Sequence, residues 1–561
     1  MSTLDTRRGW TLDTLAALAL GVFAFGFRLL SLRNLSNDHF MHMVWSQQLL
    51  GGDLPGRDFL DPGMPMAIVL SAAAQWLSPG PFSEAVLSIA LLAVACAATT
   101  LLTARLTRST TAGVLAGLFA VGLFTRLYGY PKVLVPAVSL LLCYAYAANP
   151  GTRRLFALAL WLAIGAMLRH DLGVYAAAAV PVVLAITHWG DLRGLGRAAA
   201  TFAGLLILVA IPYTVYIQLT EGVGEHLRIG AEFAKTDAHQ ILLAEFPTFE
   251  WLEQGSVSAW TRLDSATALF YLARLLPLAG LALLVAGRRS VSRPVAATVA
   301  GALVVLALFD VGILRHPVES RVRDIAAPFA VVALWMCADL VRRARAPRPG
   351  GLALAGGVVA VVVAAGSAAA TWHAGNLSER WDDTRIADGW EKVGESLGEV
   401  KRTGTVWPWS DFWPQNELPA VIPWLDECFD PSDRMLITWF GPEYYFFARR
   451  AFGGGQGFLY PGRAFDGVGD QQAMVARMEQ DEVRVVLLNE DRGSIAALPL
   501  VQAYIQDRFL PVGRFRMYDD TEVVIAVDRR LTARASWGAE GWPCQFVGRE
   551  ALARGGPGPR P

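Results

Sequence analysis

The sequence has few charged side chains and almost no lysine. Of its 561 residues only 17% are charged, against about a quarter in an average soluble protein. Lysine occurs only as Lys132, Lys235, Lys392 and Lys401. Acidic and basic residues balance to a formal net charge of zero, so the chain lacks the basic field of a nucleic-acid-binding protein. The shortage of charge also argues against a chain that is soluble throughout.

Cysteine is scarce and lacks the spacing of a metal site. The chain has five cysteines, and Cys96, Cys143 and Cys337 fall inside apolar runs, where cysteine is ordinarily a small core residue. Cys428 and Cys544 lie in the polar C-terminal part, and sequence alone leaves open whether they pair. Because no CxxC or histidine-rich pattern accompanies them, we expect no cysteine-based metal centre.

Apolar residues are abundant and grouped. They make up 54% of the chain, and the mean hydropathy is +0.37. They come in runs of about 15 to 22 residues, the length of bilayer spans. The first run is too long for a signal-peptide core, so we expect it to be retained. The predicted transmembrane helices lie at roughly 11–32, 83–104, 110–125, 130–148, 155–168, 172–187, 198–220, 266–287, 295–314, 324–341 and 351–371.

The placement of arginine predicts the orientation. With the N-terminus inside, every even-numbered span ends in an arginine-rich segment on the cytoplasmic side, as the positive-inside rule requires. The loop at 221–265 holds eight acids against three bases and falls outside. We therefore expect a multi-pass protein of the plasma or inner membrane, with its C-terminal part outside.

The composition becomes more polar after about residue 372. We predict a polytopic α-helical membrane domain at 1–371 with a long first outer loop at 33–82, an extracytoplasmic α/β domain at 372–535 and a disordered tail at 536–561. Helix-like stretches occur near 388–402, 416–428, 469–480 and 498–508, and strand-like runs at 435–440, 483–488 and 522–527. The glycine-rich segment 453–457 lacks the Lys-Ser/Thr and the following helix of a phosphate loop, so we interpret it as a plain loop.

Asp38 stands at the start of a short helix predicted at 39–50. We expect this helix to be amphipathic and to lie along the membrane interface, with His42 one turn after Asp38 on the same face. An aspartate before a helix is usually its N-cap, so capping and chemistry are both open for Asp38. Turn-forming roles are equally open for Asp58 and Asp61, which flank an aromatic residue and precede a proline.

Other outer loop ends supply charges at the same depth. They include Lys132, Arg169, Asp171, Arg315, Arg321, Arg323 and Asp324. Ionisable residues at membrane depth are costly and are functional candidates by default, although any single arginine can be a solvated loop end. A carboxylate that accepts a proton, beside guanidinium groups that hold a phosphate, suits group transfer from a phosphate-linked donor.

The first outer loop resembles that of GT-C glycosyltransferases of the protein O-mannosyltransferase-like and lipid A aminoarabinose transferase-like type. Many relatives carry an acidic pair after the first helix, then an aromatic-rich helix and a Gly-x-x-Pro-Tyr-Arg-Asp-Phe segment. Residues 52–59 read Gly-Asp-Leu-Pro-Gly-Arg-Asp-Phe, with Gly56 in place of the aromatic residue. The family spacing makes Asp38 the first acid, and His39 stands where the second is expected. His42 matches a histidine of some relatives, and 169–173 resembles an Arg-x-Asp-x-Gly element.

This resemblance implies an inverting glycosyltransferase that uses a polyprenyl-phosphate-linked sugar, a hexosyl or pentosyl group. The acceptor would be a hydroxyl of a glycan, lipid or protein on the extracytoplasmic face of a bacterial cell envelope. Asp38 would be the general base. Arg169 and Arg323, with Arg315, Arg321 and Lys132, would bind the donor phosphate. The residues expected in supporting roles are His39, His42, Arg57, Asp58, Asp61 and Asp171.

Three points stay open at this stage. Some relatives use a divalent metal, which Asp38, His39 and His42 could hold in part, but no ligand spacing requires one. A transporter or flippase of a lipid-linked envelope component also needs intramembrane charges, yet here the charges cluster at one face and no matching broken helices occur. A non-catalytic receptor or scaffold would tolerate Asp38→Asn, whereas the enzyme would lose transfer.

Overall fold

The structure, a computed structural model, describes residues 3–33, 35–61, 63–255, 260–314, 318–345, 351–403, 420–459, 467–489, 495–517, 520–539 and 541–548. The chain divides into two compact units. We call Met1–Leu32, Ala85–Val215 and Asp237–Val400 the helical unit, and Arg33–Glu84, Tyr216–Thr236 and Lys401–Pro561 the mixed unit. The first outer loop thus groups with the C-terminal part of the chain. The predicted domains, in contrast, are continuous stretches of sequence.

The long helices of the helical unit follow the order of the apolar runs. They are α1 (Thr3–Leu30), α4 (Pro81–Thr107), α5 (Thr110–Gly122), α6 (Tyr130–Ala148), α7 (Thr152–Leu168), α8 (His170–Thr187), α9 (Leu192–Thr220), α12 (Arg262–Ala286), α13 (Arg293–Ile313), α15 (Ala326–Ala344) and α16 (Gly351–Ala374). Among the described residues, nine helices are long and apolar enough to cross a membrane, whereas α5 and α7 have 13 and 17 residues. The prediction of a polytopic α-helical membrane protein is confirmed.

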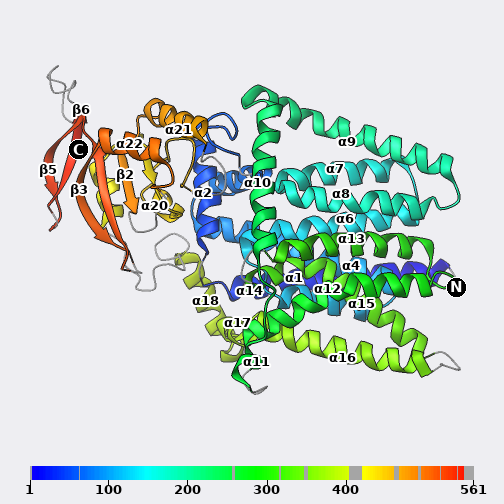
Figure 1. The fold of residues 1–561 in the computed structure, drawn as a ribbon. Helices are drawn as coiled ribbons and strands as arrows, with labels where there is room; N and C mark the ends of the chain where they lie inside the picture. The colour runs from blue at the N-terminus through cyan, green and yellow to red at the C-terminus, as the bar shows by residue number, and fades with distance from the viewer. Residues whose placement is uncertain are drawn as a thin grey trace. The chain divides into compact units, whose positions relative to one another are not determined.

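Short elements join these helices. They are η1 (Leu127–Gly129), α11 (Glu250–Gln254), α14 (Val318–Arg321), η3 (Val322–Ile325), α17 (Leu377–Asp383), η4 (Ile386–Asp388) and α18 (Trp390–Thr403). Helix α13 packs against α6, α8, α12 and α15 (Figure 1). Close approach of helices uses small residues, as is usual in membranes. A Cβ atom on Gly113 of α5 would lie 2.6 Å from the carbonyl oxygen of Thr100 in α4.

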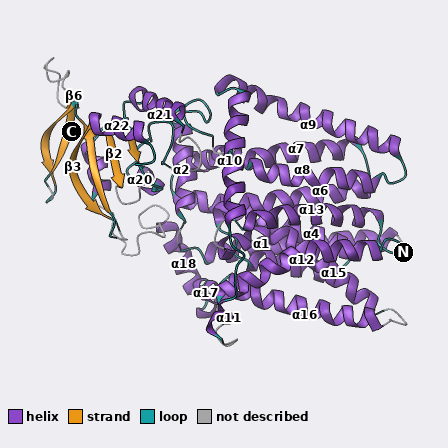
Figure 2. Ribbon diagram, viewed as in Figure 1, coloured by secondary structure: helices purple, strands orange, loops and turns teal. Residues whose placement is uncertain are grey.

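The mixed unit contains a four-stranded sheet in the order β1-β2-β4-β3, and its strands are drawn in orange in Figure 2. Its strands are β1 (Met435–Ile437), β2 (Val485–Asn489), β3 (Phe509–Arg516) and β4 (Glu522–Asp528). β1 and β2 are parallel, and the other two pairings are antiparallel. Leu436, Val486 and Ala526 from three of the strands join the buried core that α21 and α22 cover. The helices of this unit are α2 (Asn37–Leu50), α3 (Pro65–Leu77), α10 (Val223–Leu243), α19 (Val421–Cys428), α20 (Pro442–Phe447), α21 (Val468–Gln480) and α22 (Pro499–Arg508).

The predicted α/β character is confirmed, but residues 542–548, which we expected to be part of a disordered tail, form a strand. Strands β5 (Leu531–Trp537) and β6 (Trp542–Gly548) pair as an antiparallel hairpin. A disulfide joins Cys428 of α19 to Cys544 of β6. The indole of Trp424 in α19 donates a hydrogen bond to the carbonyl of Pro543 at 2.9 Å. These contacts with a helix more than a hundred residues earlier order a segment whose own composition predicts disorder.

Candidate functional site

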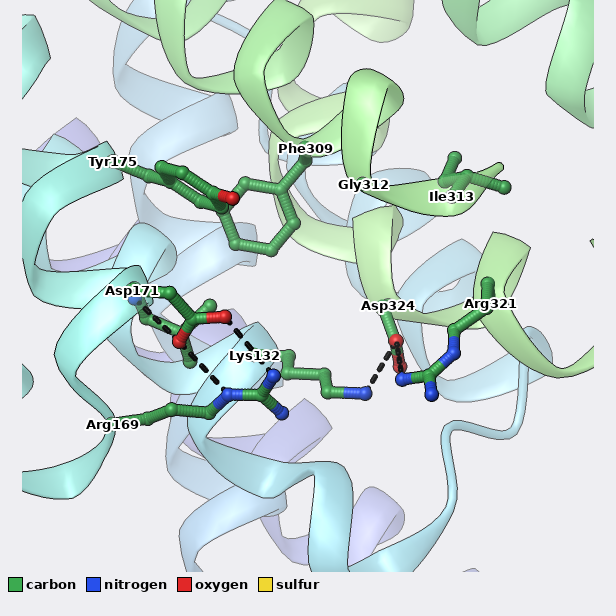
Figure 3. Close-up of a pocket in the computed structure, with 10 residues that line it drawn as sticks. Lys132, Arg169, Asp171, Tyr175, Phe309, Gly312, Ile313, Arg321 and Asp324 are labelled. Carbon is green, nitrogen blue, oxygen red and sulfur yellow. Dashed lines mark hydrogen bonds and ion pairs between the residues drawn. The ribbon is translucent and has the colours of Figure 1, made fainter. Parts of the chain in front are cut away.

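A small cavity lined by charged residues lies at one end of the helical unit. It has a volume of about 30 Å³ and is lined by residues of three loop ends: Lys132, Arg169, Asp171, Arg321 and Asp324. Lys132 stands in the first turn of α6, Arg169 and Asp171 at the junction of α7 and α8, and Arg321 and Asp324 in α14 and η3. Three of the five cations predicted to bind phosphate therefore converge in one place (Figure 3).

Asp324 holds two of the cations. Its Oδ2 lies 2.5 Å from Nζ of Lys132 and 3.7 Å from Nη1 of Arg321. The Lys132 side chain is only 6% exposed. A buried ammonium group is costly unless it is paired, so Asp324 keeps Lys132 charged beside the cavity. Sequence reasoning placed Asp324 in the right loop but gave it no role.

Arg169 and Asp171 form a second pair across the cavity. Nε and Nη2 of Arg169 donate to the two oxygens of Asp171 at 2.8 and 3.0 Å. The pair depends on a break in the helix, because Arg169 has extended backbone (φ −169°, ψ 120°) between α7 and α8. The region 155–187 is thus two helices, as predicted. A guanidinium group has five N–H donors, so this pairing leaves donors of Arg169 for a ligand.

The cavity carries a surplus of positive charge and has an apolar wall. Three cations and two carboxylates leave a formal charge of +1. The rings of Tyr175 and Phe309 lie on one side of the charged groups, with centroids 5.5 Å apart (Figure 3). The sequence did not indicate that Tyr175 and Phe309 line a cavity, because aromatic residues in an apolar run more often pack in the protein core. The starts of α6 and α8 at the cavity also favour an anion.

Two other predicted phosphate ligands are not in this cavity. Arg323 donates from Nη2 to the carbonyl oxygen of Ala374 at 2.9 Å, and its own carbonyl accepts a hydrogen bond from Thr125. It follows Arg321 by two residues, and in a 3₁₀ turn residues two apart point in different directions. Arg315 lies outside the described residues.

Asp38 belongs to the mixed unit and is the second residue of α2. The N-cap is Ser36, so the interpretation of Asp38 as the cap is wrong. A carboxylate in the first turn is favourable near the positive end of the helix dipole. The predicted amphipathic character of this helix is also wrong, because every side chain from His39 to Ser46 is buried. Helices α3 and α20 pack against α2 and cover it.

Glu84 is the buried partner of α2 that sequence reasoning missed. Its Oε1 lies 3.5 Å from Nδ1 of His39 and 3.9 Å from Nδ1 of His42, and accepts a hydrogen bond from Ser71 at 3.0 Å. His39, His42 and Glu84 are all nearly inaccessible to solvent. The available signal was an acid in the first turn of an otherwise apolar span. Among the described residues, no group of three or more metal-ligating side chains is placed to hold a metal ion.

The remaining predicted residues shape the first outer loop. Asp58 accepts hydrogen bonds from the backbone N–H of Leu54 at 2.8 Å and from Nε of Arg57 at 2.7 Å. Asp61 accepts from the backbone N–H groups of Gly63 and Met64. These contacts form turns. A turn-forming role and a chemical role were both expected to be possible for Asp58 and Asp61, and these contacts fit the turn-forming one.

Comparison with known proteins gives structural neighbours only. No family model matches the chain, and no curated protein matches it in sequence. The fold is similar to ArnT from Cupriavidus metallidurans bound to undecaprenyl phosphate, with 11% identity, a TM-score of 0.46 and coverage of 92% of this chain and 97% of that one. For the apo structure of the same protein the identity is 12%, the TM-score is 0.46, and the match covers 93% of this chain and 98% of that one. These neighbours are lipid A aminoarabinose transferases, the GT-C type that the first outer loop resembles. Because both TM-scores are below 0.5, the function must be argued from the residues of this chain.

Proposed function

We propose that this multi-pass membrane protein is an inverting glycosyltransferase that takes a sugar from a polyprenyl-phosphate donor. The observation that carries the proposal is the cavity of Lys132, Arg169 and Arg321 at one end of the apolar helices. Its surplus charge of +1 matches the single negative charge of a polyprenyl phosphodiester. The apolar helices around it match the lipid chain of such a donor.

The cation set also suits the product side of the reaction. When the bond between the anomeric carbon and the phosphate oxygen breaks, the lipid phosphate gains a second negative charge. The remaining N–H groups of Arg169 and the ammonium group of Lys132 stabilise that charge in a site of low dielectric constant. The cavity of about 30 Å³ holds about one or two water molecules. The phosphate therefore enters only when a flexible arginine side chain swings aside.

Asp38 is the proposed general base. Its carboxylate takes the proton of the acceptor hydroxyl as the oxygen attacks the anomeric carbon from the face opposite the phosphate. The new glycosidic bond forms as the phosphate leaves, which inverts the anomeric centre. Glu84, through His39 and His42, holds the helix that carries Asp38.

The disulfide supports an extracytoplasmic position for the mixed unit. Disulfides form and persist in oxidising compartments and are rare in the cytosol. Cys428 and Cys544 are bonded, whereas Cys96, Cys143 and Cys337 of the helical unit are free thiols. The orientation predicted from arginine placement puts Cys428 and Cys544 on the oxidising side.

Glycan analysis of cells tests this function. Cells that lack the protein are complemented with the wild type, Asp38→Asn or Arg169→Gln, and the envelope glycans are compared. We expect the wild type to restore a missing sugar and both variants to leave it missing, although they insert and fold normally. An unchanged glycan profile without the protein, or full restoration by Asp38→Asn, would contradict the proposal.

A further inference from the structure

A second, larger hollow lies within the mixed unit, and the proposed donor chemistry does not use it. Its volume is about 300 Å³, at the lower end of the range of about 300–1,000 Å³ for small-molecule sites. Three parts of the chain form its walls: 56–60 of the first outer loop, 221–229 around the start of α10, and 454–456 of the glycine-rich loop together with 470–477 of α21. Residues far apart in sequence are thus brought around one space.

The charges in this hollow nearly cancel. Its charged lining residues are Arg57, Arg228, Arg477, Asp58, Glu221, Glu225 and Asp470. Three arginines and four carboxylates leave a formal charge of −1. This hollow therefore selects neither a phosphate nor a strongly cationic group, in contrast to the cavity at Lys132.

The charged groups are paired around the rim and remain accessible. Arg228 lies 2.5 Å from Glu225 and 3.3 Å from Asp470, and Arg477 lies 3.1 Å from Asp58. The side chains of Arg228 and Glu225 are 40% and 46% exposed. The hydrogen bond from Arg228 also lowers the pKa of Glu225, which keeps this carboxylate ionised as an acceptor.

Such pairs offer planar donors and acceptors side by side. A carboxylate has about four acceptor positions and a guanidinium group five N–H donors, so one ion pair does not exhaust either group. A sugar hydroxyl both donates and accepts, and adjacent hydroxyls can bridge an arginine and a carboxylate together. Phe59 and Met474 also line the hollow and give it a small apolar surface, suited to the C–H face of a sugar ring.

Stability alone does not account for this arrangement. An exposed ion pair such as Arg228–Glu225 contributes only about 0–1 kcal/mol, so it does little to hold the three segments together. The turn of the glycine-rich loop depends on glycine, because Gly454 and Gly455 have φ values of +80° and +74°, which L side chains rarely adopt. The segment interpreted from sequence as a plain loop forms a wall of the hollow.

We propose that this hollow binds a neutral saccharide, which serves as the acceptor or as the part of it next to the reacting hydroxyl. The assignment as acceptor rests on the proposed glycosyl transfer, whereas saccharide binding by the hollow stands on its own. Arg228, Glu225 and Arg477 hydrogen-bond the hydroxyl groups. The acceptor is then a glycan or a glycan-bearing lipid, not an unmodified protein.

Binding to sugars without any donor lipid tests this assignment. Full-length protein in lipid nanodiscs is applied to an array of immobilised neutral and phosphorylated oligosaccharides. We expect wild-type protein to be retained by a subset of neutral oligosaccharides, and Glu225→Gln/Arg228→Gln to bind them at least tenfold more weakly. The matched control is Arg514→Gln/Glu522→Gln, which removes another exposed ion pair of the same unit, outside the hollow, and it should bind as the wild type does.

Retention by phosphorylated oligosaccharides only, no retention by any neutral one, or equal binding by the Glu225→Gln/Arg228→Gln variant would overturn the assignment. Because no polyprenyl phosphate is present, each of these results concerns the hollow alone. Failure of the proposed transferase function would show instead as unchanged glycans in cells lacking the protein, with sugar binding intact.

Discussion

At the residue scale, the charged side chains that matter are those whose partners lie far away in the sequence. Lys132 pairs with Asp324 across nearly two hundred residues, and Asp53 with Arg434 across almost four hundred. Sequence reasoning found Lys132, Arg169 and Arg321 because charge is expensive at the ends of apolar runs. It could not separate Arg321 from Arg323, because a turn of 3₁₀ helix decides which of them faces the cavity.

Glu443 gives a residue-scale prediction about pH. Burial raises the pKa of this carboxyl group to about 8, against about 4.5 when exposed, so the folded state retains a proton that the unfolded state loses. The contribution of Glu443 to stability is therefore full below about pH 4.5 and falls as pH rises toward 8. We expect Glu443→Gln to be more stable than the wild type at pH 8, by something on the order of a few kcal/mol, and to lose that advantage near pH 5.

Thermal unfolding of both proteins in detergent across this pH range measures the difference. Glu479→Gln, which changes a solvent-exposed glutamate of α21, is the control and should show no such pH dependence. A Glu443→Gln variant whose advantage is the same at pH 5 and pH 8 would show that this carboxyl group is already ionised in the fold.

At the element scale, the apolar runs predicted the order of the long helices, because run length alone defines a span. Of the eleven predicted spans, α5 and α7 are shorter than a full span in the described part of the chain. The misses have a common cause. Helix α3 and helix α10 lie in segments expected to be loops, and β3 follows α22 without a turn. Helix α2 was expected to be amphipathic, with one exposed face, whereas helix α20 from the C-terminal part of the chain packs against it. Such tertiary partners cannot be read from local periodicity.

The contact between α4 and α5 gives the prediction at this scale. Gly113→Leu places a side chain against the backbone of Thr100, and overpacking of this kind costs about 1–3 kcal/mol. We expect a lower unfolding temperature in detergent. Gly204→Leu in α9, where a Cβ atom would meet nothing within 4 Å, is the matched control and should unfold as the wild type does. Equal unfolding temperatures for both variants would mean that α5 does not pack this closely.

At the scale of the whole molecule, the two units differ in how well sequence reasoning described them. In the helical unit, the helices were predicted from hydropathy. Lys132, Arg169 and Arg321 of the cavity were singled out because charged side chains at membrane depth are energetically costly. The α/β character of the mixed unit was also predicted, but its assembly from three separate stretches of chain was not. Its hairpin β5–β6 is held by the bond between Cys428 and Cys544, whose pairing sequence alone left open.

Counting thiols tests the proposed orientation of the mixed unit. Of the five cysteines, three are free and two are bonded. Protein purified from the membrane under thiol-blocking conditions and then denatured should take up three alkyl groups before reduction and five after it. Mass spectrometry reads both numbers. Five alkyl groups before reduction would place Cys428 and Cys544 in a reducing compartment and reverse the proposed orientation.

Native mass spectrometry of the purified protein with undecaprenyl phosphate or undecaprenol tests the proposal that Lys132, Arg169 and Arg321 bind a polyprenyl phosphate. We expect at least tenfold tighter binding of the phosphate form by the wild type. Arg169→Gln should abolish this preference, and Arg126→Gln, which removes an exposed cation of a neighbouring loop outside the cavity, should retain it. Equal binding of the alcohol and its phosphate by the wild type, or an unchanged preference in Arg169→Gln, would contradict the proposal.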